Sequence, residues 1–417
     1  MKSICLLLLI AVGAIAVVNG GEFRTDINPA MRYYQGFILS PDLSKADRDY
    51  LFEKEWRGQK LPARFGELVS RYDNQFKLVR QAAQATVPCD WGIDMSPGPA
   101  TLLPHLARCR GSAQAARLRT MWALQNGLQS EARDDLLAAL TLGRNASRDG
   151  TMIAALVQIA IENIVCSFVA ENFHQFSPGI LKQISDQFTA APPRGTLAAC
   201  IAMEKTSFLV WLVDKIVTLQ KQNPGDDARV MAGIREVISG FGSGDEGQGN
   251  PAKPSLWEQV NKAARGKSEG VLKLLRDEEA LYQRMAVIMA LPQSEFDTQV
   301  KQFSAEVESS ANPFVTETIP AVQKARPKEF AVMAHLAMVR AAVEYKLRGE
   351  AGLKSVIDPY GQAPFSFARF IFEGVDRGFE LKSAYAGRDF PEVLIFVEKD
   401  GSPFYVTGPK AGQSASK

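Results

Sequence analysis

The sequence predicts a mainly α-helical fold of stacked antiparallel helices, irregular or solenoid-like, with a small C-terminal antiparallel β unit. Three observations support this prediction. Apolar residues recur at helical spacing over most of the 417-residue chain. Breaks rich in proline and glycine divide this pattern into segments. Short β-rich runs bounded by turn residues replace it only after about residue 356.

The first twenty residues have the pattern of an export signal. Lys2 supplies a positive charge, residues 4–18 form an apolar run, and small residues follow it. This order is typical of a cleaved secretory signal. We therefore predict a signal peptide over 1–20, cleaved after Gly20, and an exported protein of the bacterial periplasm or the extracellular space. An uncleaved N-terminal membrane anchor is the alternative, although a membrane span usually needs roughly 20 apolar residues.

Residues 21–239 are expected to form a helical domain. Apolar residues at steps of three and four give one stripe within a helix over about 46–85: Leu68, Tyr72, Phe76 and Val79. The Pro- and Gly-rich segment 87–99 interrupts the pattern. Thr101 is a candidate N-cap for the next helix, and Pro192-Pro193 separates the last two. Five helices are expected at about 101–126, 129–145, 150–174, 178–189 and 194–222.

The rest of the chain changes character twice. Residues 240–254 are rich in glycine and are predicted to be a linker or loop. Helical patterning returns over 255–355. Residues 356–410 are expected to form the β unit, with a hairpin turn at Asp400-Gly401, and 411–417 a disordered tail. Within the second helical segment, helices are expected at about 255–291, 293–311 and 327–349.

Composition and charge narrow the functional classes. Apolar residues make up 46% and charged residues 23% of the chain, which is ordinary for a globular protein. The formal net charge of +2 is too balanced for a nucleic-acid binder. The chain has three histidines, His105, His174 and His335, and this scarcity of the commonest general base disfavours an enzyme. We expect neither a nucleic-acid partner nor a cofactor.

Four cysteines remain after export, and an even number in an oxidising compartment permits two disulfides. We predict Cys89–Cys109, which closes a loop of about twenty residues, and Cys166–Cys200, which ties successive helices. A bridge across a loop of that size contributes about 3 kcal/mol in the chain-entropy model. The alternative is that the cysteines are buried small apolar residues.

No set of residues is assigned a catalytic or metal-binding role. His105 with Cys89 and Cys109 lacks the paired spacing and the four ligands of a structural zinc site. A Cys89–His105 thiol–imidazole pair is conceivable, but a structural role for the loop cysteine is favoured. Glu162, Glu171 and Glu204 are conceivable as buried acids. Trp56, Trp91 and Tyr33-Tyr34 could line a ligand groove. For each of these residues, an ordinary role in packing or at a helix surface is favoured.

Small and apolar residues at Gly127, Ala132, Leu136 and Ala139 have the offsets found across a tetratricopeptide turn and its second helix. Together with Cys89-Asp90-Trp91-Gly92 and residues 98–106, the helices over 116–162 resemble uncharacterised exported bacterial helical proteins of this tetratricopeptide-like kind. This resemblance implies an extracytoplasmic compartment and a type of module, without an activity.

The C-terminal segment resembles a different group. Residues 358–365 and 378–383 are similar to the β end of type II secretion pseudopilins. Pseudopilins carry their own N-terminal processing site, with a glutamate in the first mature turn and a long hydrophobic helix. Because the N-terminus here is an ordinary signal, pilin-like assembly is not expected.

Two hypotheses on function follow. In the first, the protein is a non-enzymatic interaction or scaffold protein whose stacked helices bind an envelope or secreted partner protein. In the second, it is an exported hydrolase with a polar pocket near the loop Cys89–Gly92. The first is favoured because of the export signal and the few histidines. A membrane contact is expected only through an uncleaved signal.

Overall fold

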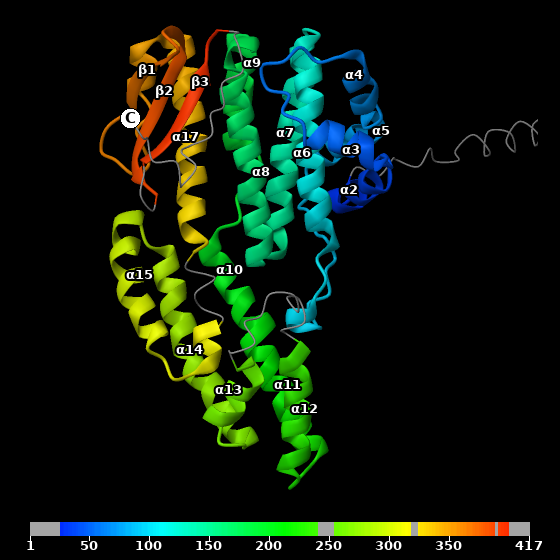
Figure 1. Ribbon diagram of the computed structural model, residues 1–417, viewed down its shortest axis with the longest axis vertical. Coiled ribbons are helices and arrows are strands. Elements are labelled where there is room, and N and C mark those ends of the chain that lie inside the picture. The colour runs from blue at the N-terminus through cyan, green and yellow to red at the C-terminus, as the bar shows by residue number, and fades with distance from the viewer. Residues whose placement is uncertain (1–25, 241–253, 318–323, 388–390, 400–417) are drawn as a thin grey trace, which may run out of the picture.

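The computed structural model describes residues 26–240, 254–317, 324–387 and 391–399, and confirms the predicted fold class. Most of the described chain is helical, and a three-stranded antiparallel sheet lies near its C-terminal end. Figure 1 shows an upper body of long, side-by-side helices and a narrower lower lobe. The predicted signal peptide, 1–20, lies outside the described residues.

The upper body contains the first helices of the chain and the last ones. Helices α6, α7, α8 and α17 form its long vertical members in Figure 1, and the sheet lies beside α17. Its helices are α2 (Pro29–Ile38), α3 (Lys45–Phe52), α4 (Ala63–Ser70), α5 (Asp73–Ala83), α6 (Pro104–Gln125), α7 (Gln129–Ala146), α8 (Met152–Glu171), α9 (Pro178–Ala190), α17 (Arg326–Arg348) and α18 (Glu350–Lys354).

The hairpin of α6 and α7 follows from its turn chemistry. Gly127 adopts φ +74°, Gly127 N–H donates to Leu124 O at 3.0 Å, and Leu128 N–H donates to Ala123 O at 2.9 Å. This is a Schellman C-cap, which needs a residue that tolerates the left-handed region. Thr151 and Ser177 cap α8 and α9 with their side-chain oxygens.

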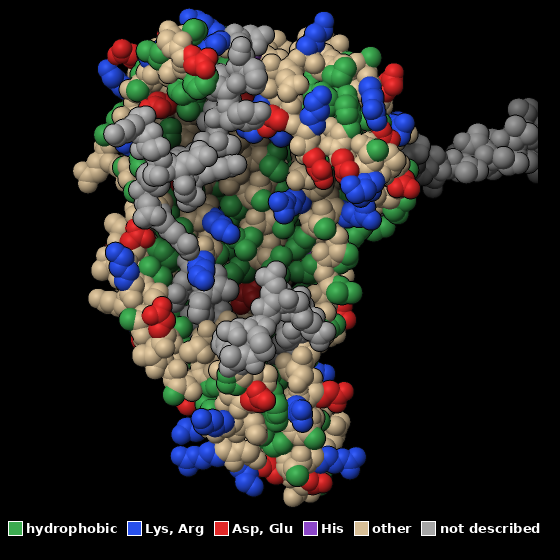
Figure 2. Space-filling view, in the orientation of Figure 1, with side chains coloured by type: hydrophobic (Ala, Val, Ile, Leu, Met, Phe, Trp, Pro, Cys, Tyr) green, Lys and Arg blue, Asp and Glu red, His purple; other side chains and the backbone are tan. Residues whose placement is uncertain are grey.

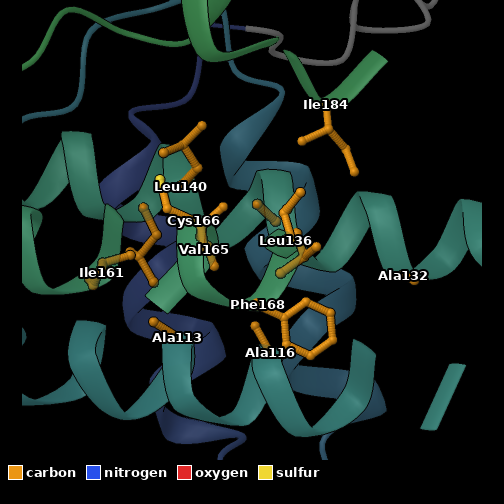
Figure 3. Packing of buried hydrophobic residues seen from close by; sticks show 14 of the residues in the cluster. Ala113, Ala116, Ala132, Leu136, Leu140, Ile161, Val165, Cys166, Phe168 and Ile184 are labelled. Carbon is orange, nitrogen blue, oxygen red and sulfur yellow. The ribbon is translucent and has the colours of Figure 1, made fainter. Parts of the chain in front are cut away.

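Small side chains let these helices approach closely. In Figure 3, Ala113 and Ala116 of α6 lie beside larger side chains of α8, such as Phe168. Ala132, Leu136 and Ala139 are all buried, as expected of a tight αα-hairpin; a relation to tetratricopeptide proteins stays a prediction. The labelled core residues are Ala113, Ala116, Ala132, Leu136, Leu140, Ile161, Val165, Cys166, Phe168 and Ile184.

Several predicted helix limits are corrected. The helix expected over 46–85 is three helices, because a loop with Gly58 at φ +65° follows α3 and a short turn separates α4 from α5. The stripe Leu68, Tyr72, Phe76 and Val79 is buried even so. Helix α6 begins at Pro104, and Thr101 instead ends a short 3₁₀ turn. Helices α2 and α12 had not been predicted.

The lower lobe has its own apolar core. Residues of α12 and α13 both contribute to this core, although the predicted linker lies between them; 241–253 are outside the described residues. The long helix expected over 255–291 is broken at Arg265 and Gly266, both with positive φ. The lobe's helices are α10 (Leu197–Glu204), α11 (Trp211–Gln222), α12 (Asp227–Ser239), α13 (Leu256–Ala263), α14 (Ser268–Ala290) and α15 (Gln293–Glu308).

The sheet has the order β1 (Ser366–Phe372), β2 (Val375–Ala386) and β3 (Pro391–Val397). Glu373 and Gly374, both with positive φ, form the two-residue turn between β1 and β2. The hairpin predicted around Asp400-Gly401 lies outside the described residues. The sheet packs on the helices through aromatic rings, since Phe379 and Phe396 lie 5.9 and 5.3 Å from Phe173.

One described helix, α8, is long and apolar enough to cross a membrane by length and composition alone. Of its most apolar window, 61% is buried inside the protein. This burial is typical of the central helix of a folded core, as the sequence predicts.

Candidate functional site

The loop Cys89–Gly92, predicted as a site of hydrolase chemistry, is packed against the protein. The Trp91 ring lies 5.6 Å from that of Tyr33 and 4.5 Å from that of His105, stacked on both. Asn28 fixes the loop from outside by donating to Asp90 O at 2.6 Å and accepting from Asp90 N–H at 3.1 Å. Residues 89–92 line none of the cavities described below.

The four described cysteines, Cys89, Cys109, Cys166 and Cys200, are buried free thiols, and neither predicted bridge is formed in the structure. Cys166 belongs to the upper core and Cys200 to the lower one, so their side chains pack in different clusters. Burial raises the pKa of Cys89 and of Cys200 to about 12. Because the thiolate is the reactive form, these thiols are poor nucleophiles.

His105 is fully buried beside Asp149, with 3.4 Å between Nε2 and Oδ2. Neither imidazole nitrogen has a hydrogen-bond partner in the described structure. Within the described residues, no three His, Cys, Asp or Glu side chains are grouped so that they could hold a metal ion. His105 therefore packs as a core residue on Trp91.

The three glutamates considered as buried acids have distinct surroundings. Glu162 is enclosed by arginines, and Arg194 Nη2 lies 2.8 Å from its Oε2. Glu204 accepts from Met152 N–H at 2.8 Å, and burial raises its pKa. Glu171 lies at the edge of a cavity and pairs with Arg57 at 3.1 Å. The first two are structural partners of neighbouring helices.

Three adjoining cavities form a groove along one side of α6. The first, of about 740 Å³, lies between α6 and the segment from α2 to α5. The middle one, of about 160 Å³, shares Phe52 and Gln114 with the first. The third, of about 600 Å³, shares Trp56 and Met121 with the middle one. We call these three cavities together the α6 groove.

One face of α6 supplies a wall of the groove along nearly its whole length. Six of its ten lining residues follow one another at steps of three and four, so their side chains lie along one side of the helix. From the first to the last, the helix rises about 26 Å at 1.5 Å per residue. These residues are Arg108, Gly111, Gln114, Leu118, Met121 and Gln125.

In the middle and third cavities, the loop between α3 and α4 forms the opposite wall. Between α3 and α4, Gln125 clamps the chain by accepting from Leu61 N–H at 2.6 Å and donating to Leu61 O at 3.0 Å. Trp56 Nε1 donates to Tyr50 O at 3.0 Å, and the Trp56 ring packs edge-on against Phe65 at 5.1 Å. These contacts hold the groove open before a ligand arrives, which reduces the entropy lost on binding.

Gly111 is the least expected residue of this groove. It lies inside α6, where glycine costs about 0.5–1 kcal/mol of stability relative to alanine. A Cβ placed on Gly111 would meet nothing within 4 Å, whereas one on Gly66 would lie 2.3 Å from the Trp122 ring. The Trp122 ring therefore explains why position 66 needs a glycine. No contact within the protein explains the glycine at position 111.

The first cavity also contains an unsatisfied polar atom. Gln75 lines the cavity, is 2% exposed, and donates through Nε2 to Ser112 Oγ at 2.9 Å. Its Oε1 has no hydrogen-bond partner in the described structure. A buried acceptor of this kind is stabilised when a donor from a ligand or a water reaches it.

Comparisons with protein-family models, with curated proteins and with solved structures find no match. The site is thus defined by its geometry alone. Of the groove residues, the sequence indicates only Trp56 and Glu171 as candidates for a site, because the walls come from segments far apart in the chain. A glycine inside a strongly helical segment, Gly111, was the one signal in the sequence.

Proposed function

We propose that the protein is an exported, non-enzymatic interaction protein that binds a segment of a partner protein in the α6 groove. The export pattern of residues 1–20 supports the compartment. The groove supports the binding role because it is elongated, preformed and lined by apolar and polar side chains. The closed loop at Cys89–Gly92 favours this proposal over the hydrolase hypothesis.

Gly111 is the observation that carries the proposal. Glycine in a helix interior is destabilising, and no neighbouring atom needs the space that Gly111 leaves. Gly179 has the same open space but is the second residue of α9, outside the helix interior. Local features that weaken a fold without a gain in packing are expected at functional sites. A ligand that approaches the backbone of α6 closely would use this space.

Site-specific photo-crosslinking tests the proposal in cells that produce the protein. A photoreactive residue at Gln114, an exposed position in the groove, should yield an adduct with a discrete partner. The same residue at Arg110, exposed on α6 but outside the three cavities, should not.

Leucine substitutions at two helical glycines, one inside the groove and one outside it, provide a matched comparison. Gly111→Leu should remove the Gln114 adduct, because the new side chain projects into the first cavity one helical turn from Gln114. Gly179→Leu, at a second helical glycine whose Cβ would meet nothing within 4 Å, should leave it unchanged. An adduct that persists at full yield in Gly111→Leu would reject the groove as the binding site. Mass spectrometry of the mature N-terminus tests export separately, since a retained Met1 contradicts cleavage.

A further inference from the structure

The charges of the α6 groove are unequal. Six cationic side chains line its three cavities, against three carboxylates. The imbalance is greatest in the middle and third cavities, where four cations face Glu171 alone. The cations are Arg48, Lys54, Arg57, Lys60, Arg108 and Arg117, and the carboxylates are Asp42, Glu53 and Glu171.

From this imbalance, and resting on the proposed function of the groove, we infer that its occupant is an acidic, amphipathic segment of a partner protein. Glu55 and Glu171 offset Arg57 and Arg117, with oxygens 2.8, 3.1 and 3.6 Å from their guanidinium nitrogens. The excess positive charge of these two cavities therefore comes from Lys54 and Lys60. Lys60 and Arg108 form no ion pair with any described residue and lie near opposite ends of the groove. Carboxylates of the partner segment would pair with Lys60 at one end of the groove and with Arg108 at the other.

The apolar part of the occupant has its own contacts. Ile38 and Phe52, on the rim of the first cavity, are 81% and 37% exposed. Met121 and Ile164 line the narrow middle cavity together with Trp56. Large apolar side chains in a rim of cations are the arrangement that binds a segment with alternating apolar and acidic residues. Figure 2 shows Lys and Arg side chains among Asp and Glu side chains over the segment from α3 to α5, at the upper right of the molecule.

The length of the occupant follows from the length of the groove. About 26 Å along α6 corresponds to roughly 8 residues of an extended chain or roughly 17 residues of a helix. A random library of displayed peptides of roughly 17 residues therefore contains occupants of either conformation.

Selection from this library against the purified mature protein tests the inference. Peptides retained by the wild-type chain and lost with Gly111→Leu should be enriched in Asp and Glu interspersed with Leu, Ile, Phe or Trp. The double variant Lys54→Glu/Lys60→Glu should bind the selected peptides at least tenfold more weakly. Raising salt from about 50 to 500 mM should weaken wild-type binding, because exposed charges are screened.

The outcomes separate this inference from the proposed function. Gly111-dependent peptides that are neutral or basic would overturn the acidic occupant and leave the binding groove standing. Peptides that bind equally well to Gly111→Leu would overturn both. Circular dichroism of each variant checks that it is folded, and Gly179→Leu, which lies outside the groove, should select the wild-type set.

Discussion

The Arg194 guanidinium donates three hydrogen bonds to the carboxylate of Glu162, at 2.8–3.0 Å. Glu162 is on α8 in the upper body, and Arg194 is in the connection that leads into the lower lobe. Arg144 of α7 adds a fourth bond at 3.2 Å. The next residue, Gly195, donates to Gln158 Oε1 at 2.8 Å. These bonds fix the point at which the two parts of the molecule join.

Glu162→Gln should lower the free energy of unfolding by about 3–5 kcal/mol. The variant leaves the buried Arg144 without a carboxylate and Arg194 with only Glu329, 3.8 Å away, and breaking a buried ion pair on one side has costs of this order. Urea denaturation measures the change. Asp186→Asn, which breaks the exposed pair of Lys182 and Asp186 on α9, is the control and should cost less than about 1 kcal/mol. Equal losses in the two variants would contradict the structural role of Glu162.

Glu55 makes a specific contribution to the pH dependence of stability. Hydrogen bonds from the Arg57 side chain lower the pKa of Glu55 from 4.5 to about 2. The folded state therefore favours the carboxylate, and its stabilisation is complete above pH 4.5 and lost as the pH falls toward 2. As the pH falls from 4.5 to 2, the free energy of unfolding of Glu55→Gln should decrease less than that of wild type. Denaturation at several pH values measures the difference. Glu67→Gln, an exposed site, should follow wild type.

The buried thiols should be unreactive in the native protein. Burial raises the pKa of all four cysteines, so little thiolate is present at pH 7. Iodoacetamide should therefore modify native protein far more slowly than urea-denatured protein. After denaturation without reductant, we expect four modified cysteines, as in the structure. Two unreactive cysteines would contradict this expectation, and peptide mapping would show whether they are Cys89 and Cys109 or Cys166 and Cys200.

The long helices could be predicted because their signals are local. Helices α7 and α9 begin and end within about a residue of their predicted limits, since apolar periodicity and Pro or Gly breaks coincide there. Helix α2 was missed although Asn28 followed by Pro29 is a start signal, with Asn28 Oδ1 accepting from Ala30 N–H at 3.0 Å. The turn at Glu373-Gly374 was missed because a glutamate there has no strong preference for positive φ.

The groove could not be predicted in the same way. Its walls combine α6 with a loop about 60 residues earlier, and the clamp of Leu61 by Gln125 is a tertiary contact without a local pattern. The favoured role of Trp91 as a packed residue agrees with its place between aromatic rings. Trp56, treated identically from sequence, is buried and also lines two cavities of the groove.

Gly111→Ala should raise the free energy of unfolding by about 0.5–1 kcal/mol, because alanine restricts the unfolded chain and favours helix. Its methyl group would meet nothing within 4 Å. Gly66→Ala should do the reverse and cost about 1–3 kcal/mol, because its methyl group would overlap the Trp122 ring. Urea denaturation of the two variants measures both effects. A loss of stability in Gly111→Ala would mean that the fold itself requires this glycine, and the argument for a ligand at α6 would fail.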